Sequence, residues 1–103
     1  MDLRELSDEV EAVSAGYARR FGIERTPEWL MLKLTEEVGE LTRAFLRLTG
    51  QGRTSSPAEE LQAGLGAELA DVVCHAVLLA RHHGVDLDAA IAAKWLVWKP
   101  PQP

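Results

Sequence analysis

The feature that most constrains the fold is an apolar repeat at helical spacing between residues 30 and 48 of the 103-residue chain. Six apolar side chains recur every three or four residues: Leu30, Leu34, Val38, Leu41, Phe45 and Leu48. Because a helix turns by about 100° per residue, this spacing places all six on one side of a single helix. A helix with one continuous apolar side packs that side against a core. The repeat therefore predicts a helix within a folded, helical domain.

Start and stop signals divide the chain into four predicted helices joined by short loops. The helices run from about Asp2 to Phe21, from Pro27 to Thr49, from a capping box at Ser56 to His82, and from Leu87 to Trp98. Thr26 and Asp86 are the expected N-caps of the second and fourth helices, and Ser56 with Glu59 has the spacing of a capping box. Gly64 and Gly66 weaken the third helix, where we expect a kink, a break or a close helix crossing.

No segment shows the alternation of a strand, and the chain has no internal repeat. We therefore predict an all-α, four-helix bundle for residues 1–99, as a single domain, and a Pro-rich tail at residues 100–103. The stretch from Glu68 to His82 is apolar almost all round. Such a helix is expected to be buried or covered by another subunit.

The charge balance excludes some partners. The chain has 16 acidic and 11 basic residues, a formal charge of -5, so the basic surface of a nucleic-acid-binding protein is not expected. Cys74 is the only cysteine, which excludes an intrachain disulfide and fits a reducing compartment. No signal-like N-terminus is present, and no apolar run approaches the roughly 18 residues of a membrane span. We expect a soluble, cytoplasmic protein that binds neither a nucleic acid polymer nor a membrane.

Carboxylates gather beside the predicted core in two places. Glu36, Glu37 and Glu40 lie close together in the second helix, and Glu68 and Asp71 share one face of the third. If these two helices pack antiparallel, the two groups can meet. So many neighbouring carboxylates cannot all ionise unaided, so that either their pKa values rise or a cation neutralises them. All-oxygen ligation of this kind suits Mg²⁺ or Mn²⁺.

Other side chains on the same flank could contact a ligand. Trp29, Lys33 and Arg47 lie on the flank of Glu36 and Glu40, and they offer one aromatic ring for stacking and two cations for phosphates. The competing interpretations are an ion pair between Lys33 and Glu37 and ordinary packing of Trp29 at the start of the helix.

Two side chains of the third helix lie near the acidic pair. His75 follows Asp71 by one turn, so a metal-ligand role is conceivable, but a lone histidine near a core is more often a hydrogen-bonded structural residue. We expect Cys74 to be a small buried hydrophobic residue.

The sequence Glu36-Glu37-Val38-Gly39-Glu40-Leu41, followed by Glu68-Leu69-Ala70-Asp71, resembles the signature of the MazG-like, all-α nucleoside triphosphate pyrophosphohydrolases. The resemblance extends from about Trp29 to Trp95. It implies Mg²⁺-dependent hydrolysis of a nucleoside triphosphate between its α and β phosphates, which releases monophosphate and pyrophosphate and removes unwanted nucleotides.

The resemblance also implies roles for individual residues. Carried over by position, the metal ligands would be Glu37, Glu40, Glu68 and Asp71. Glu36 would hold a further metal or orient the attacking water, which makes it with Glu37 the candidate catalytic pair, and Lys33 and Lys94 would contact the phosphates. Small members of the family form dimers or dimer-of-dimers tetramers whose sites lie between subunits, so we expect a homo-oligomer with helices shared across subunits. Some relatives have asparagine and arginine after the lysine of the last helix, whereas this chain has Trp95 and Trp98 after Lys94. These two rings could stack on a base or pack against another subunit, and we favour packing.

Two other functions are considered. A non-enzymatic module for oligomerisation or regulation could use the same acids to hold a structural cation or a basic partner. A ferritin-like site with two metals is disfavoured, because that class uses Glu-x-x-His pairs and this chain has Glu-x-x-Glu and Glu-x-x-Asp.

Overall fold

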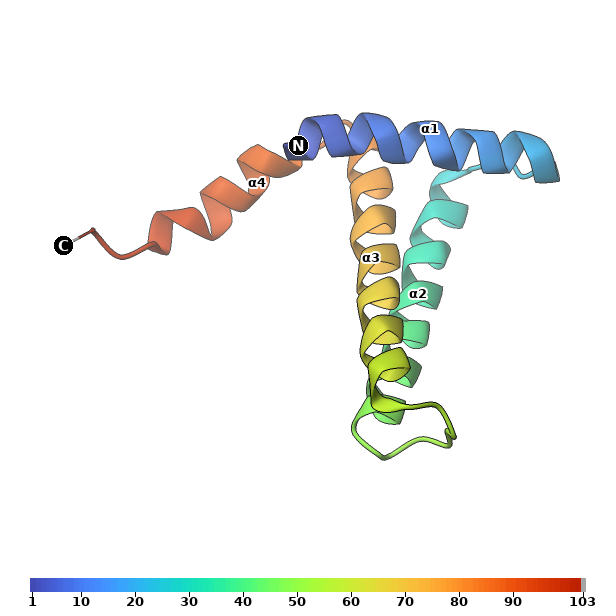
Figure 1. The fold of residues 1–103 in the computed structure, drawn as a ribbon. Coiled ribbons are helices and arrows are strands. Elements are labelled where there is room, and N and C mark those ends of the chain that lie inside the picture. The colour runs from blue at the N-terminus through green and yellow to red at the C-terminus, as the bar shows by residue number, and fades with distance from the viewer. Residues whose placement is uncertain (103) are drawn as a thin grey trace.

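The computed structural model describes residues 1–102, and its regular structure is entirely helical (Figure 1). The elements are α1 (Leu3–Phe21), α2 (Pro27–Leu48), α3 (Ala58–His82), α4 (Leu87–Lys94) and a 3-10 turn, η1 (Leu96–Trp98). Residues 1–102 contain four α-helices and no strand, which confirms the predicted all-α class. Pro103 of the predicted tail lies outside the described residues.

The ends of α1 and α2 follow the local signals in the sequence. The Asp2 carboxylate accepts a hydrogen bond of 2.8 Å from the backbone N–H of Glu5, and Gly22 ends α1 in the left-handed conformation, with φ of 64°. The Thr26 hydroxyl accepts a hydrogen bond of 3.1 Å from the backbone N–H of Trp29. These contacts satisfy backbone groups that a helix end leaves unpaired. The predicted N-cap of α2 at Thr26 is therefore confirmed. The predicted N-cap Asp86 is confirmed as well, because its carboxylate accepts a hydrogen bond of 3.2 Å from the backbone N–H of Ala89 in α4.

The predicted cap of α3 is wrong, and two of the outcomes expected at its glycines, a break and a close helix crossing, are not observed. Its N-cap is Pro57 and no side chain caps it, because Ser56 lies one residue too early for its hydroxyl to reach the first-turn N–H groups. The helix also continues without a break through Gly64 and Gly66. A Cβ atom added at either glycine would meet nothing within 4 Å, so no neighbouring helix crosses closely there.

The last predicted helix is shorter than expected. The α-helix ends at Lys94, and Leu96–Trp98 form a separate 3-10 turn. Lys94 at the end of this eight-residue helix complements the negative end of the helix dipole. The apolar side chains of Leu96, Val97 and Trp98 stay largely exposed.

The helices are arranged as a hairpin with two additions (Figure 1). α2 and α3 run side by side in opposite directions, α1 lies across the end opposite their connecting loop, and α4 extends away from both. Only four described residues are buried, and all are apolar: Ala18 of α1, Leu30 of α2, and Val77 and Leu78 of α3. The core therefore lies where α1 meets the open end of the hairpin.

A single chain does not close into the expected four-helix bundle. Its radius of gyration is 16.5 Å, compared with about 13 Å for a compact domain of this length. Large apolar side chains on every helix stay exposed, among them Val38, Phe45, Leu69, Val73, Trp95 and Trp98. A bundle in the usual sense would need helices from a second chain.

The apolar character of α3 corrects the expectation that no apolar run approaches the length of a membrane span. It contains an 18-residue window apolar enough, by length and composition, to cross a membrane. Every window that passes this test includes Glu68 and Asp71, and carboxylates are costly in the bilayer centre. One such helix is weak support for a membrane span, since the core helix of a soluble protein has the same composition.

Charged contacts hold α1 on the hairpin. The Arg25 guanidinium donates two hydrogen bonds of 2.9 and 2.8 Å to the Glu11 carboxylate, which also lies 3.0 Å from Nε2 of His82. Arg81 donates a hydrogen bond of 2.7 Å to Asp8. The hydrogen bonds from Arg25, opposed by partial burial and assisted by His82, lower the pKa of Glu11 to about 2. The carboxylate thus connects α1 to the beginning of α2 and the end of α3.

Replacing Glu11 by Gln tests this anchor. We expect the free energy of unfolding to fall by about 2 kcal/mol at neutral pH, because Arg25 loses a charged, partly buried partner. The folded-state pKa of Glu11 lies below its ordinary 4.5. Its stabilisation is therefore complete above about pH 5 and is lost as the pH falls toward 2, and the difference between wild type and Glu11→Gln should shrink over that range.

Urea unfolding followed by circular dichroism, at fixed protein concentration, measures this difference. The matched control is Glu24→Gln, which changes an exposed carboxylate that forms no ion pair among residues 1–102. A loss of stability that is equal at about pH 7 and about pH 2.5 would contradict the role of the charge.

Candidate active site

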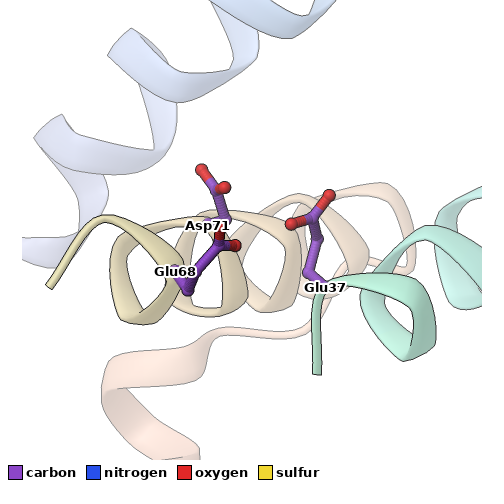
Figure 2. A group of neighbouring side chains, drawn as sticks. All are labelled: Glu37, Glu68 and Asp71. Carbon is purple, nitrogen blue, oxygen red and sulfur yellow. The ribbon is translucent and has the colours of Figure 1, made fainter. Parts of the chain in front are cut away.

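Three of the predicted metal ligands meet where α2 faces α3 (Figure 2). Glu37 extends from α2 toward Glu68 and Asp71 of α3, and one oxygen from each of the three carboxylates lies within 4.8 Å of the others. Glu68 and Asp71 share a face because they are three residues apart in a helix, and the antiparallel hairpin brings Glu37 opposite them. The predicted meeting of the two acidic groups is therefore observed.

The surroundings of Glu68 disfavour the negative charge on its carboxylate. Its Oε2 atom is covered and has no hydrogen-bond partner in the described chain. Desolvation, followed by repulsion from Asp71, Glu37 and Glu40, raises the pKa of Glu68. Carboxylates that are close, partly covered and short of donors form a donor set for a hard divalent cation, since oxygen ligands are those that Mg²⁺ and Mn²⁺ prefer.

Glu40 and Glu36 lie outside this three-residue group. Glu40 is one turn beyond Glu37, and its Oε2 atom is 3.8 Å from the Arg43 guanidinium. It still contributes to the raised pKa of Glu68, so its charge acts on the site. Glu36 is exposed and accepts a hydrogen bond of 3.2 Å from Lys33.

Lys33 is the cation nearest to the carboxylates on α2. Its Nζ atom lies 3.2 Å from Glu36 and 3.7 Å from Glu37. Partial burial disfavours the charged ammonium, but the two glutamates outweigh it and raise the pKa of Lys33. The ion pair with Glu37, weighed above as the alternative to phosphate binding, is thus present. Glu37 itself has only 13% of its side chain exposed.

A cavity of about 520 Å³ opens beside the carboxylates, in the corner between α1 and the hairpin. Its walls come from three helices and include Glu9, Val10, Val13, Ser14 and Tyr17 of α1, Trp29, Lys33 and Glu37 of α2, and Asp71, Cys74, His75 and Leu78 of α3. Its volume lies within the range of small-molecule sites, which is about 300–1,000 Å³. Glu37 and Asp71 belong both to the cavity and to the acidic group.

The structure does not bring two of the proposed phosphate contacts to this site. Lys94 ends α4, which extends away from the hairpin (Figure 1). Arg47 lies in the last turn of α2, about 15 Å along the helix axis from Glu37 at 1.5 Å per residue. Within one chain, only Lys33 and Trp29 of the predicted substrate contacts border the cavity.

Comparison with protein families agrees with this geometry. The family model described as the MazG nucleotide pyrophosphohydrolase domain matches residues 25–95, which is more than half of the chain. The chain belongs to the MazG family. No match is found among curated proteins or among solved structures. Membership of the MazG family supports nucleotide pyrophosphohydrolase activity as the general class, and the matched segment contains every residue of the acidic group.

The sequence interpretation missed two cavity residues of this MazG chain. No functional role is predicted for Tyr17, yet it is exposed and borders the cavity. His75 was assigned a structural role, yet it has no hydrogen bond to any described residue. The position of His75 one turn after Asp71, which is the reason that a metal-ligand role is considered above, is the sequence signal for its place near the acidic group, because residues four apart in a helix share a face. Tyr17 gave none, because α1 begins outside the MazG match and its angle to the hairpin is not encoded locally.

Replacing Glu68 by Gln should separate repulsion from metal binding. Without a divalent cation we expect Glu68→Gln to raise the melting temperature by a few degrees, since it removes one of the repelling charges. With millimolar Mg²⁺ the wild type should gain stability and the variant should gain much less, because a ligand is lost. Thermal unfolding with Mg²⁺ and with a chelator measures both effects.

The matched control is Glu60→Gln, an acid in the first turn of the same helix and outside the acidic group. Equal stabilisation of wild type and Glu68→Gln by Mg²⁺ would exclude Glu68 as a ligand.

Proposed function

We propose that this MazG-family chain is a Mg²⁺-dependent nucleoside triphosphate pyrophosphohydrolase that removes unwanted nucleotides from the cellular pool. The observation that carries the proposal is the meeting of Glu37, Glu68 and Asp71 beside a cavity large enough for a small molecule. Water attacks and the bond between the α and β phosphates breaks, giving a nucleoside monophosphate and pyrophosphate. The proposed compartment is the cytoplasm, and neither a nucleic acid polymer nor a membrane is a proposed partner.

The acidic residues have distinct proposed roles. Glu37, Glu68 and Asp71, with Glu40 one turn away, would hold Mg²⁺, and Mn²⁺ suits the same oxygens. When bound, the cation offsets the charge of the triphosphate and polarises the attacked phosphorus. Glu37 and Glu36 are proposed to orient the attacking water. In such chemistry the protein contributes mainly positioning and electrostatic stabilisation.

Lys33 is the proposed phosphate contact within one chain. In the structure its ammonium is shared between Glu36 and Glu37. A cation on Glu37 would weaken the attraction between Glu37 and Lys33, which leaves the ammonium available for an anionic phosphate. Trp29 is the proposed contact for the base, since its ring borders the same cavity. Arg47 and Lys94 are proposed to act only at a site shared with a second subunit.

We also propose a homo-oligomer, either a dimer or a dimer-of-dimers tetramer. The extended shape and the exposed apolar side chains support it, because surfaces of this kind usually mark an interface. Val73 on α3 is 49% exposed, and Trp95 and Trp98 beyond α4 are 71% and 82% exposed. A second chain packed on α3 would bury these groups and share helices across subunits.

Release of pyrophosphate tests the activity directly. A panel of canonical and damaged ribo- and deoxyribonucleoside triphosphates should give product with Mg²⁺ from one or a few substrates, and none with a chelator. Glu40→Gln and Asp71→Asn should each reduce turnover by at least about 100-fold while the helical circular dichroism spectrum is kept.

Normal turnover in both variants would refute the assigned site. Silence across the whole panel, with Mg²⁺ still raising the melting temperature, would favour the non-enzymatic alternative, a metal-binding helical module for oligomerisation or regulation.

Substitution of Val73 by Glu tests the assembly. A buried, unpaired carboxylate at an interface is strongly unfavourable, so we expect Val73→Glu to shift the oligomer toward monomer. Analytical ultracentrifugation across a dilution series gives the species present. Thr54→Glu, in the exposed loop between α2 and α3, is the control and should leave the assembly unchanged. A wild-type chain that sediments as a monomer at all concentrations would overturn the proposed oligomer.

A further inference from the structure

A groove lies between α2 and α3 near the open end of the hairpin, and it shares no residue with the cavity described above. Its volume is about 600 Å³. Ala76 and Ala80 are one turn apart in α3, so their small side chains leave room for a large one between the helices. Open apolar surface of this kind usually marks a site for a partner. Most of the wall is apolar, with three residues from each helix: Pro27, Met31 and Leu34 of α2, and Ala76, Leu79 and Ala80 of α3.

The C-terminal arm, residues 94–99, presents apolar side chains that stay largely exposed. Trp95, Leu96, Val97 and Trp98 follow one another, and between 57% and 82% of each is exposed. The backbone N–H of Trp98 donates a hydrogen bond of 3.1 Å to the carbonyl oxygen of Trp95. Since a 3-10 helix has about three residues per turn, the two indoles lie on the same side of the arm. The arm therefore offers one large aromatic face.

The arm lies away from the groove of its own chain. Val85, in the turn before α4, borders that groove, whereas α4 leads away from the hairpin (Figure 1). α4 and η1 together project about 18 Å, at about 1.5 Å per residue in an α-helix and about 2.0 Å in a 3-10 helix. A return to the groove would require α4 to unfold or to reverse its direction. Packed helices lie about 8–10 Å apart, so the same length is enough to cross the two helices of a neighbouring chain.

The charges at the edges of the two surfaces are complementary. Lys94 and Lys99 flank the apolar residues of the arm, and no acid lies between them. Glu28 is the carboxylate in the described wall of the groove, and it forms no ion pair with another residue of the described chain. An ion pair at the rim of an interface adds little affinity, but it favours one orientation of the partner.

We propose that the C-terminal arm of one copy docks in the groove between α2 and α3 of a second copy, with Trp95 and Trp98 against Ala76 and Ala80. The inference rests on the proposed homo-oligomer and assigns the two surfaces that meet in it. A two-fold axis makes the contact reciprocal, so each copy contributes one arm and one groove. A buried tryptophan contributes about 150–250 Å². Two indoles and the groove that they cover therefore come close to the roughly 800 Å² per partner of a stable interface.

A lipid surface fits the arm less well, although tryptophan and lysine also suit a membrane interface. The chain has a formal charge of -5, which opposes adsorption to an anionic membrane, and a bilayer on the arm would leave the groove uncovered. A second copy covers both surfaces at once.

Complementation between two variants tests the docking. Met31→Glu places a charge in the groove and keeps the arm, whereas Trp95→Ser combined with Trp98→Ser removes the aromatic face of the arm and keeps the groove. Each variant alone should form dimers with a dissociation constant at least about 30-fold above that of the wild type, because interface tryptophans commonly contribute this much. An equimolar mixture regains one contact between arm and groove, so we expect mixed dimers at least about tenfold tighter than those of either variant. Analytical ultracentrifugation of the full chain, with a label on one variant, measures all three.

Leu32→Glu is the matched control for the groove. Leu32 is the next residue of α2, is 67% exposed and lies outside the groove, so the same substitution there should leave the dissociation constant unchanged. Ala76→Glu introduces a charge from the opposite wall and repeats the test with a second groove variant. Circular dichroism checks that each variant keeps its helical content.

Tryptophan fluorescence reports whether the indoles are covered. With rising protein concentration the emission of the wild type should shift to shorter wavelength, and the shift should persist in Trp29→Phe, which removes the third tryptophan of the chain. Met31→Glu should lose the shift at the same concentrations. Neither measurement needs nucleotide or metal, so both are independent of pyrophosphate release.

The outcomes separate this inference from the proposed function. A mixture that assembles no better than its components, or dimers without a fluorescence shift, would overturn the docking of the arm and leave the proposed homo-oligomer standing. A wild type that stays monomeric would overturn both. Binding to phosphatidylglycerol vesicles that is lost with the two tryptophans, without any shift as protein concentration rises, would overturn the second copy as the partner. Recovery in the mixture, for a chain that releases no pyrophosphate, would support the docking while refuting the enzymatic proposal.

Discussion

The antiparallel contact between α2 and α3 governs the other features of the structure. Leu30 of α2 and Val77 and Leu78 of α3 are buried, and the same pairing of helices brings Glu37 opposite the acids of α3. In this one interface, the burial of apolar side chains therefore stabilises the helix pair and the repulsion between carboxylates destabilises it. Because the two helices are held by their apolar contacts, the acids cannot move apart to relieve the repulsion. The hairpin thus preorganises a site for positive charge, at some expense to its own stability.

The same helix that carries two of these acids is also long and apolar enough, by composition, to cross a membrane. α3 has only a small part of its apolar surface covered by α1 and α2. The proposed second copy of the chain would cover this surface without enclosing the acids, whereas a bilayer would have to surround Glu68 and Asp71. In an assembly the two acids would still face Glu37 on one side, while the remaining sides of α3 would become an interface.

Much of this organisation could be predicted from the sequence, because its signals are local. The Thr26 and Asp86 caps, the helical class and the meeting of the acidic groups all depend on spacing within a helix or on a short connection between two helices. The crossing of α1 could not be predicted, because it depends on contacts such as Arg25 with Glu11, which are 14 residues apart, and on Arg81 with Asp8, 73 residues apart. The cavity follows from that crossing. Ser56 shows the limit of local signals as well, since a proline at the next position takes the cap.

The two ion pairs that attach α1 to the rest of the chain should differ in their sensitivity to salt. The pair of Glu11 with Arg25 is partly buried, whereas the pair of Asp8 with Arg81 is exposed. Dissolved ions screen exposed pairs more than covered ones. Rising ionic strength should therefore loosen the beginning of α1 first, while the part next to α2 stays in place. The cavity residues Val13, Ser14 and Tyr17 belong to the part that stays in place, so this wall of the cavity should keep its position at ionic strengths that already loosen the beginning of α1.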